Sequence, residues 1–270
     1  MGSLKLVFIV SFPFFLASSL NAQNINIGFQ DSIFSEVLEE NRRIFIHLPD
    51  DYENSDKSYP VIYRLDGEID LLVETVGVIY RLAYREELLP DMIVVMIQNT
   101  HRDRDMLPVT TFFYQSEPGA VNFQKFINSE LVPYIDNTYR TTNERILCGQ
   151  SLSSIFTLYN LLTETSIFNS YIACSAGFPD CEDYFMNLAK EMKSTHSDRE
   201  ITVFLSNGLK DPLDPDGIMN QMIGDFSNFI ESIDNITSKY VIYEEEGHVP
   251  YQSLYHGLKF LYRIQSEERQ

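Results

Sequence analysis

The pentapeptide Gly149-Gln150-Ser151-Leu152-Ser153 lies between two apolar runs, and its place constrains the fold more than any other feature of the chain. Residues 145–148 are apolar enough for a buried strand, and residues 152–162 carry apolar side chains at helical spacing. A serine at such a strand-to-helix corner sits in a strained turn, with its hydroxyl above the sheet and backbone N–H groups beside it. This arrangement suits a nucleophile, although Ser153 stands where the G-x-S-x-G pattern has its second glycine.

An acid and a histidine follow two later strand-like runs. Residues 201–205 run into a polar segment that ends at Asp211, and residues 240–243 run into one that ends at His248. Both therefore stand just past the carboxyl end of a predicted strand, the edge where parallel sheets gather catalytic groups. The chain order serine, acid, histidine is that of the α/β-hydrolase triad.

We therefore predict Ser151 as the nucleophile, His248 as the general base and Asp211 as the acid that orients the imidazole. The alternative for Ser151 is a helix N-cap. His101, which follows another predicted strand, is the rival of His248. Asp214 and Asp216 remain rivals of Asp211, because the whole segment 211–217 is rich in acids.

Strand-like runs alternate with helix-like runs along the chain, which predicts an α/β fold with a mostly parallel central sheet and helices on both faces. The predicted strands are 32–38 and 43–48 as a hairpin, then 60–65, 92–97, 145–148, 171–174, 201–205 and 240–243. The predicted helices are 71–87, 123–135, 152–162, 218–233 and 254–262, and their Phe and Met stripes are interpreted as core.

The N-terminus has the pattern of a secretory signal peptide. Lys5 precedes the apolar run 6–16, and small or polar residues follow up to Ala22. The apolar run is shorter than the roughly 20 residues that span a membrane. We predict a signal peptide over 1–22, a single hydrolase domain over 23–270, no membrane insertion after cleavage, and a periplasmic or secreted location.

Charge and cysteines limit the partners. The formal net charge is 20 − 39 = −19, and removal of Lys5 with the signal peptide makes it −20. Such acidity argues against nucleic acid and anionic membranes as partners and favours neutral or cationic small-molecule substrates. No C-x-x-C pair is present, and the EF-hand pattern in the acid-rich segment lacks its first ligand and has Ile223 where the bidentate glutamate belongs, so we expect no metal and no cofactor. Whether Cys174 and Cys181 form a disulfide is left open.

Five segments in order carry a resemblance to a known family. They are 59–67 (YPVIYRLDG), 99–105 (NTHRDRD), 123–136 (FQKFINSELVPYID), 145–152 (RILCGQSL) and 246–248 (EGH). With them the chain resembles the putative esterase (esterase-D-like) family of α/β-hydrolases, nearest to its ferric-siderophore-esterase-like branch. The resemblance implies an α/β-hydrolase fold and a secreted serine carboxylesterase that works through an acyl-enzyme on siderophore or acylated-glycan esters.

The resemblance also implies roles for further residues. The oxyanion hole would be formed by the N–H of Leu152, next to the nucleophile, and by that of Gly67 or Glu68. Arg102 and Arg104 would bind an anionic part of the substrate with His101 in the same pocket, the alternative being a self-paired surface network.

Other readings stay open. They are an acyltransferase with the same triad, a non-catalytic binding protein of the same fold, and a triad whose acid is dispensable. The departures from the family pattern at Ser153 and at 175–178 leave helix packing and substrate class undecided.

Overall fold

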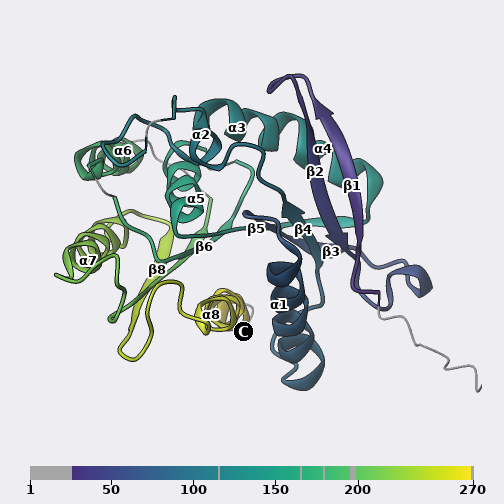
Figure 1. Ribbon diagram of the computed structural model, residues 1–270. Coiled ribbons are helices and arrows are strands. Elements are labelled where there is room, and N and C mark those ends of the chain that lie inside the picture. The colour runs from purple at the N-terminus through teal and green to yellow at the C-terminus, as the bar shows by residue number, and fades with distance from the viewer. Residues whose placement is uncertain (1–25, 115, 165, 179, 195–198, 269–270) are drawn as a thin grey trace, which may run out of the picture.

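The computed structural model describes residues 26–114, 116–164, 166–178, 180–194 and 199–268 (Figure 1). The signal peptide predicted for 1–22 lies outside these residues. Within them, no helix combines the length and the apolar character that crossing a membrane requires.

One twisted sheet of eight strands organises the chain, in the order β1-β2-β4-β3-β5-β6-β7-β8. Strand β2 is antiparallel to both β1 and β4, and all other neighbours are parallel. Because the parallel strands end at one edge, the loops after β5, β6, β7 and β8 lie together there. The strands are β1 (Phe29–Ser35), β2 (Glu40–His47), β3 (Tyr59–Arg64), β4 (Ile93–Ile97), β5 (Thr141–Gln150), β6 (Ser170–Cys174), β7 (Ile201–Gly208) and β8 (Ile236–Tyr243).

Helices cover both faces of the sheet, which confirms the predicted fold class (Figure 1). One face packs against α1 (Ile69–Tyr80), the π-helical turn η2 (Arg81–Arg85) and α8 (Ser253–Glu268). The other packs against α3 (Ala120–Phe126), the π-helical turn η3 (Ile127–Leu131), α4 (Val132–Thr138), α5 (Leu152–Thr163), α6 (Glu182–Ser194) and α7 (Ile218–Ile230). Short helices η1 (Tyr52–Asn54) and α2 (Arg102–Met106) complete the described part of the chain.

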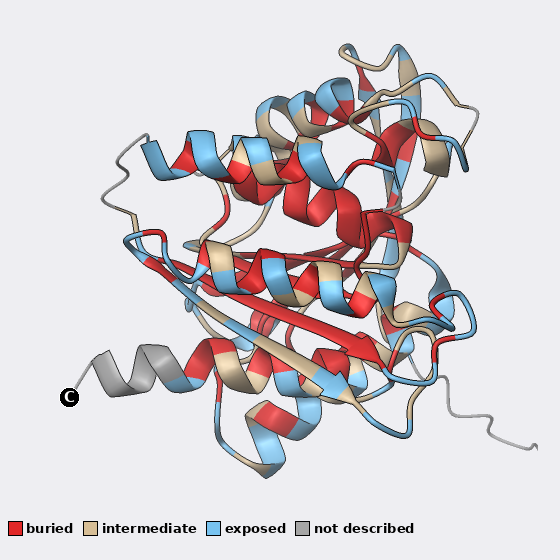
Figure 2. Ribbon diagram, turned by 90° about the vertical axis from the view of Figure 1, so that its left-hand side faces the viewer, coloured by how far each residue is buried: buried red, intermediate tan, exposed pale blue. Residues whose placement is uncertain are grey.

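The core consists of the central strands and the inner sides of the helices, as Figure 2 shows by the concentration of buried residues there. Strands β3, β4, β6 and β7 are buried along their whole length, because helices cover them on both faces. The predicted Phe stripes are core: Phe123 packs on Phe156 with ring centroids 5.0 Å apart, and Phe226 packs on Phe178 at 5.1 Å.

Two α-helices were not expected from the sequence. Helix α6 buries only Phe185, Ala189 and Met192, a stripe too narrow to stand out among its charges. Helix α2 has five residues and lies in a segment interpreted as loop. The three cysteines are free and buried, so Cys174 and Cys181 do not pair.

Candidate active site

Ser151 occupies a sharp turn between β5 and α5. Its backbone has φ 53° and ψ −125°, a strained conformation for a residue with a side chain. Its N–H donates to the carbonyl of Cys174 at 2.8 Å, which fixes the turn to β6. A Cβ on Gly149 would lie 2.4 Å from the Ser153 carbonyl oxygen. Glycine is therefore required there so that the first turn of α5 can pack onto the strand.

Ser151, His248 and Asp211 are connected by hydrogen bonds at the carboxyl edge of the sheet. His248 Nε2 lies 2.8 Å from Ser151 Oγ, and His248 Nδ1 lies 2.7 Å from Asp211 Oδ2. The Asp211 side chain is 4% exposed, whereas that of His248 is 27% exposed. The Asp211 carboxylate accepts a hydrogen bond from Nδ1–H, which leaves Nε2 as the acceptor that faces the serine hydroxyl.

The three candidate acids have different environments. Only Asp211 contacts His248, and its second oxygen accepts the N–H of Leu213 at 2.8 Å. Asp214 instead accepts the N–H groups of Met219 and Asn220, each at 2.9 Å, at the N-terminus of α7. Asp216 is exposed to solvent. The sequence left these three residues unresolved, and the structure places Asp211 alone against the imidazole.

Close contact between two loops brings the acid to the histidine. A Cβ on Gly208, at the end of β7, would lie 2.0 Å from the carbonyl oxygen of Gly247. The N–H of Lys210 donates to the Glu246 carbonyl at 2.9 Å. The segment before Asp211 and the segment before His248 therefore lie against each other, and a side chain at position 208 would separate them.

Ser175 holds the segment after His248 and was not assigned a role from the sequence. Its Oγ accepts the N–H of Val249 at 2.8 Å, and its own N–H donates to the Ser206 carbonyl at 2.7 Å. Both Ser175 (φ 50°) and Val249 (φ 57°) have positive φ. The only signal in the sequence was the departure from the family pattern at 175–178.

The expected oxyanion donors need one correction. The Gly67 N–H donates to the Ile97 carbonyl at 2.8 Å and is not free for a ligand. A Cβ on Gly67 would lie 2.6 Å from the Ile97 carbonyl carbon, so this glycine serves close packing against the end of β4. The Glu68 N–H donates to the Asp66 carbonyl at 2.7 Å in a tight three-residue turn of the γ type. Leu152 is the first residue of α5, where an N–H has no partner inside the helix.

Asp66 connects the loop after β3 to the elbow. Its carboxylate accepts Asn99 Nδ2 at 2.7 Å, Arg102 Nε at 2.7 Å and Arg102 Nη2 at 2.9 Å, and Ser153 Oγ at 2.8 Å. Burial alone raises the pKa of Asp66, but the bonds from Arg102, Asn99 and Ser153 outweigh it and the pKa is lowered. Ser153 Oγ also lies 2.8 Å from the Gln150 carbonyl and accepts the Gln150 N–H at 2.8 Å. The residue that replaces the motif glycine thus links the two loops.

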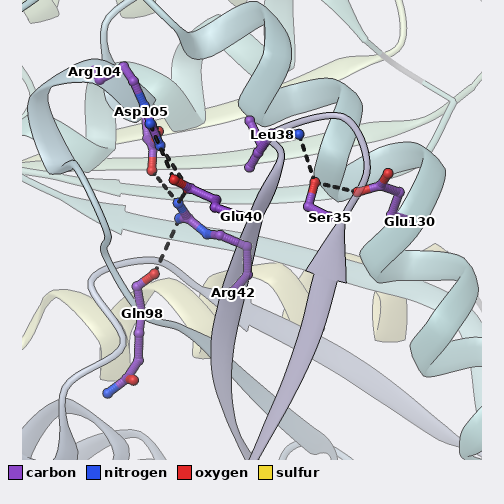
Figure 3. Close-up of polar contacts among 8 residues, drawn as sticks. All are labelled: Ser35, Leu38, Glu40, Arg42, Gln98, Arg104, Asp105 and Glu130. Carbon is purple, nitrogen blue, oxygen red and sulfur yellow. Dashed lines mark hydrogen bonds and ion pairs between the residues drawn. The ribbon is translucent and has the colours of Figure 1, made fainter.

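The arginines after β4 are occupied by carboxylates. Arg104 contacts Glu40 and Asp105, and the fully buried Arg42 lies 2.7 Å from the same two carboxylates (Figure 3). For Arg104 the structure therefore gives the self-paired alternative, in a network that ties β2 to α2. Arg102 is paired with Asp66, and His101 is exposed just before α2. His101, Arg102 and Arg104 do not line the pocket described next.

A pocket of about 240 Å³ opens onto Ser151 and His248. Its walls come from the loop before α3, the first turns of α5, the loops after β6, β7 and β8, and the first turn of α7. The lining residues are Phe113, Tyr114, Ser151, Leu152, Ile155, Ser175, Gly177, Leu213, Met219 and His248.

Comparison with known proteins identifies the family of the chain. The model of the family described as putative esterase matches residues 35–245. The chain therefore belongs to the putative esterase family and has the α/β-hydrolase fold.

Three relatives illustrate the likeness. The ferri-bacillibactin esterase BesA of Bacillus subtilis is 29% identical over 180 residues, a match that covers 56% of this chain and 59% of that protein. An IroE-like serine hydrolase from Shewanella oneidensis is 26% identical with a TM-score of 0.78, covering 87% of this chain and 80% of the other. The BES protein of Bacillus cereus shares the fold, with 21% identity, a TM-score of 0.73, and 97% and 99% of the two chains covered.

Proposed function

We propose that this chain is a serine carboxylesterase in which Ser151, His248 and Asp211 form the catalytic triad. The observation that carries the proposal is the continuous path of hydrogen bonds from Ser151 Oγ through the imidazole to the buried Asp211 carboxylate, at 2.8 and 2.7 Å. Family membership supports the same chemistry.

The reaction follows from this arrangement. His248 Nε2 takes the proton as Ser151 Oγ attacks the ester carbonyl, and Asp211 stabilises the imidazolium that forms. Collapse of the tetrahedral intermediate breaks the bond to the alcohol oxygen, which receives the proton from Nε2, and leaves an acyl-enzyme. Water then attacks the acyl carbonyl, gives a proton to Nε2, and releases the acid as Ser151 Oγ regains its hydrogen.

The oxyanion hole in this proposal consists of the N–H groups of Leu152 and Glu68. Leu152 follows the nucleophile, and its N–H belongs to the unpaired first turn of α5. Glu68 stands at the N-cap of α1, and its N–H must leave the bent contact with the Asp66 carbonyl to reach a developing oxyanion. Asp66, held by Arg102 and Ser153, would position that loop.

The substrate in this proposal is a small-molecule ester, and siderophore esters and acylated glycans are the two candidate classes. The first is supported by the name of the Bacillus subtilis relative, a ferri-bacillibactin esterase. Export through the segment 1–22, leaving 23–270 as one hydrolase domain, is part of the same proposal.

The test is release of p-nitrophenol from p-nitrophenyl acetate by the purified protein and by Ser151→Ala. Ser129→Ala is a matched control, because Ser129 is an exposed serine on η3. We expect turnover in the wild type and in Ser129→Ala and a loss of at least a thousandfold in Ser151→Ala. A folded wild-type protein that neither turns over the ester nor reacts with a fluorophosphonate would instead be a binding protein. Transfer of the acyl group to an added alcohol in preference to water would indicate an acyltransferase.

A further inference from the structure

The pocket beside Ser151 is apolar and carries no fixed charge. None of its ten lining residues is Asp, Glu, Lys or Arg, and His248 is the one histidine among these ten residues. Phe113 and Leu213 line it and are 67% and 64% exposed. Large apolar side chains that remain exposed beside a reactive serine indicate a surface for apolar ligands.

The aromatic side of this pocket is held by hydrogen bonds. The N–H of Phe112 donates to Asp180 Oδ2 at 3.2 Å, and that of Tyr114 donates to Thr111 Oγ1 at 3.1 Å. The rings of Phe112 and Phe113 meet edge to face with centroids 5.9 Å apart. These contacts hold the backbone on both sides of Phe113, which lowers the entropic cost of presenting its ring to a ligand.

The volume limits the size of the ligand group. At about 240 Å³ the pocket exceeds the roughly 150 Å³ cavity that holds benzene, but it is below the roughly 300–1,000 Å³ of pockets that bury drug-sized ligands. On one side a Cβ on Gly177 would lie 2.6 Å from Met219 Sδ, so the thioether already fills the space above that glycine. The pocket therefore accommodates one arm of an ester and not a whole large ligand.

Nearby cations are already neutralised. Arg102 makes two bonds to Asp66, and Arg104 contacts Glu40 and Asp105. The chain as a whole has a net charge of −19. An anionic group in this pocket loses hydration and gains no ion pair with a lysine or arginine in return.

We infer that the pocket receives the acyl group of the ester, and that this group is uncharged, apolar and between a benzoyl ring and a medium-length alkyl chain in size. This inference rests on the proposed function. The acyl group is the part that stays bonded to Ser151 Oγ in the acyl-enzyme, and the pocket opens directly onto that atom. Acyl groups that carry a carboxylate are rejected.

The experiment compares kcat/KM for p-nitrophenyl acetate, butyrate and hexanoate, and for p-nitrophenyl hydrogen adipate, which has the length of hexanoate and a terminal carboxylate. We expect a gain of about fourfold for each methylene that the pocket buries. We expect hexanoate to exceed hydrogen adipate by about a hundredfold or more.

Two lysine variants test the electrostatic part of the inference. Leu213→Lys places a cation at the pocket, at a position exposed enough to tolerate it. Val73→Lys makes the same charge change on α1, against the opposite face of the sheet, where Val73 is 53% exposed. The hexanoate to hydrogen adipate ratio should fall at least tenfold in Leu213→Lys and stay unchanged in Val73→Lys.

The outcomes separate the inference from the proposed function. The inference would be overturned if a Ser151-dependent enzyme turned over hydrogen adipate as well as hexanoate, or if its kcat/KM did not depend on acyl length. The proposed esterase function would stand in either case. Equal responses of the two lysine variants would overturn the inference as well. Absence of Ser151-dependent turnover of every ester, acetate included, would overturn both.

Discussion

Replacing Ser153 by alanine should destabilise the fold more than a buried serine usually does. Ser153 is fully buried, and its Oγ lies 2.8 Å from Asp66 Oδ2, the Gln150 carbonyl and the Gln150 nitrogen. Loss of a donor to an ionised carboxylate costs about 1.5–3 kcal/mol, and an N–H left without an acceptor costs about 1–3 kcal/mol. Asp66 keeps Arg102 and Asn99, and alanine favours the helix by about 0.5 kcal/mol. We therefore expect a net loss of about 2–4 kcal/mol.

The assay is the free energy of unfolding from urea titrations, with Ser154→Ala as the matched control. Ser154 is equally buried and lies in the same turn, but its hydroxyl bonds only to the Ser151 carbonyl. Loss of such a backbone bond should cost less than about 1 kcal/mol. The reasoning would be refuted if the two variants were equally stable, or if Ser153→Ala lay within about 0.5 kcal/mol of the wild type.

The same substitution should slow catalysis and should respond to acid. Loosening the link between the elbow and the Asp66 loop moves the proposed Glu68 donor, and small misplacements cost about tenfold to a hundredfold in rate. Because the pKa of Asp66 is lowered in the fold, its stabilisation is complete above the unfolded pKa of about 3.9 and is lost as the pH falls through the folded value. The stability difference should therefore persist at neutral pH and shrink below about pH 4. Ser153→Gly should not rescue either property.

Three further predictions test other parts of the molecule. Asp211→Asn should lower kcat on the order of 10³–10⁴-fold with little change in the free energy of unfolding. Asp214→Asn should instead lower the free energy of unfolding by about 1 kcal/mol and nearly keep kcat. Steady-state kinetics and urea titrations of both variants check this, and the reverse pattern would contradict the assignment of Asp211 as the acid. Arg42→Met leaves the buried Asp105 carboxylate without that partner and should cost about 3–5 kcal/mol in the free energy of unfolding, so a neutral result would contradict the network of Figure 3. The native protein should react slowly with a thiol reagent, since burial raises the pKa of Cys148 and Cys181 to about 12 and also raises the pKa of Cys174. In urea without reductant all three thiols should react, whereas a disulfide would leave one reactive thiol and would contradict this prediction.

The parts of the fold that could be predicted from the sequence are those determined by the residue pattern of a short segment. Buried strands such as 92–97 have no polar interruption because helices cover both faces, and the elbow is defined by Gly149 and Ser151 within three residues. Helix α6 was not predicted because its buried apolar stripe is narrow and lies among charged residues.

The parts that could not be predicted depend on contacts between distant segments. The Gly67 N–H is taken by Ile97, a carbonyl thirty residues away whose position no pattern near Gly67 reveals. Asp211 and Asp214 lie in the same acid-rich turn, and only the paths of α7 and the loop after β8 decide which one faces His248. From the sequence Ser153 is only a departure from the motif glycine, because its hydrogen bond to Asp66 joins two segments that are distant in the chain.

Trapping the acyl-enzyme is the most direct test of the proposed chemistry. Wild-type protein and Ser151→Ala would be mixed with p-nitrophenyl butyrate, quenched in acid within milliseconds, digested and examined by mass spectrometry. We predict a butyryl adduct on the peptide that contains Ser151, formed with a burst of p-nitrophenol close to the enzyme concentration, and no adduct in the variant. An adduct on another residue, or Ser151-independent release of p-nitrophenol, would contradict the account.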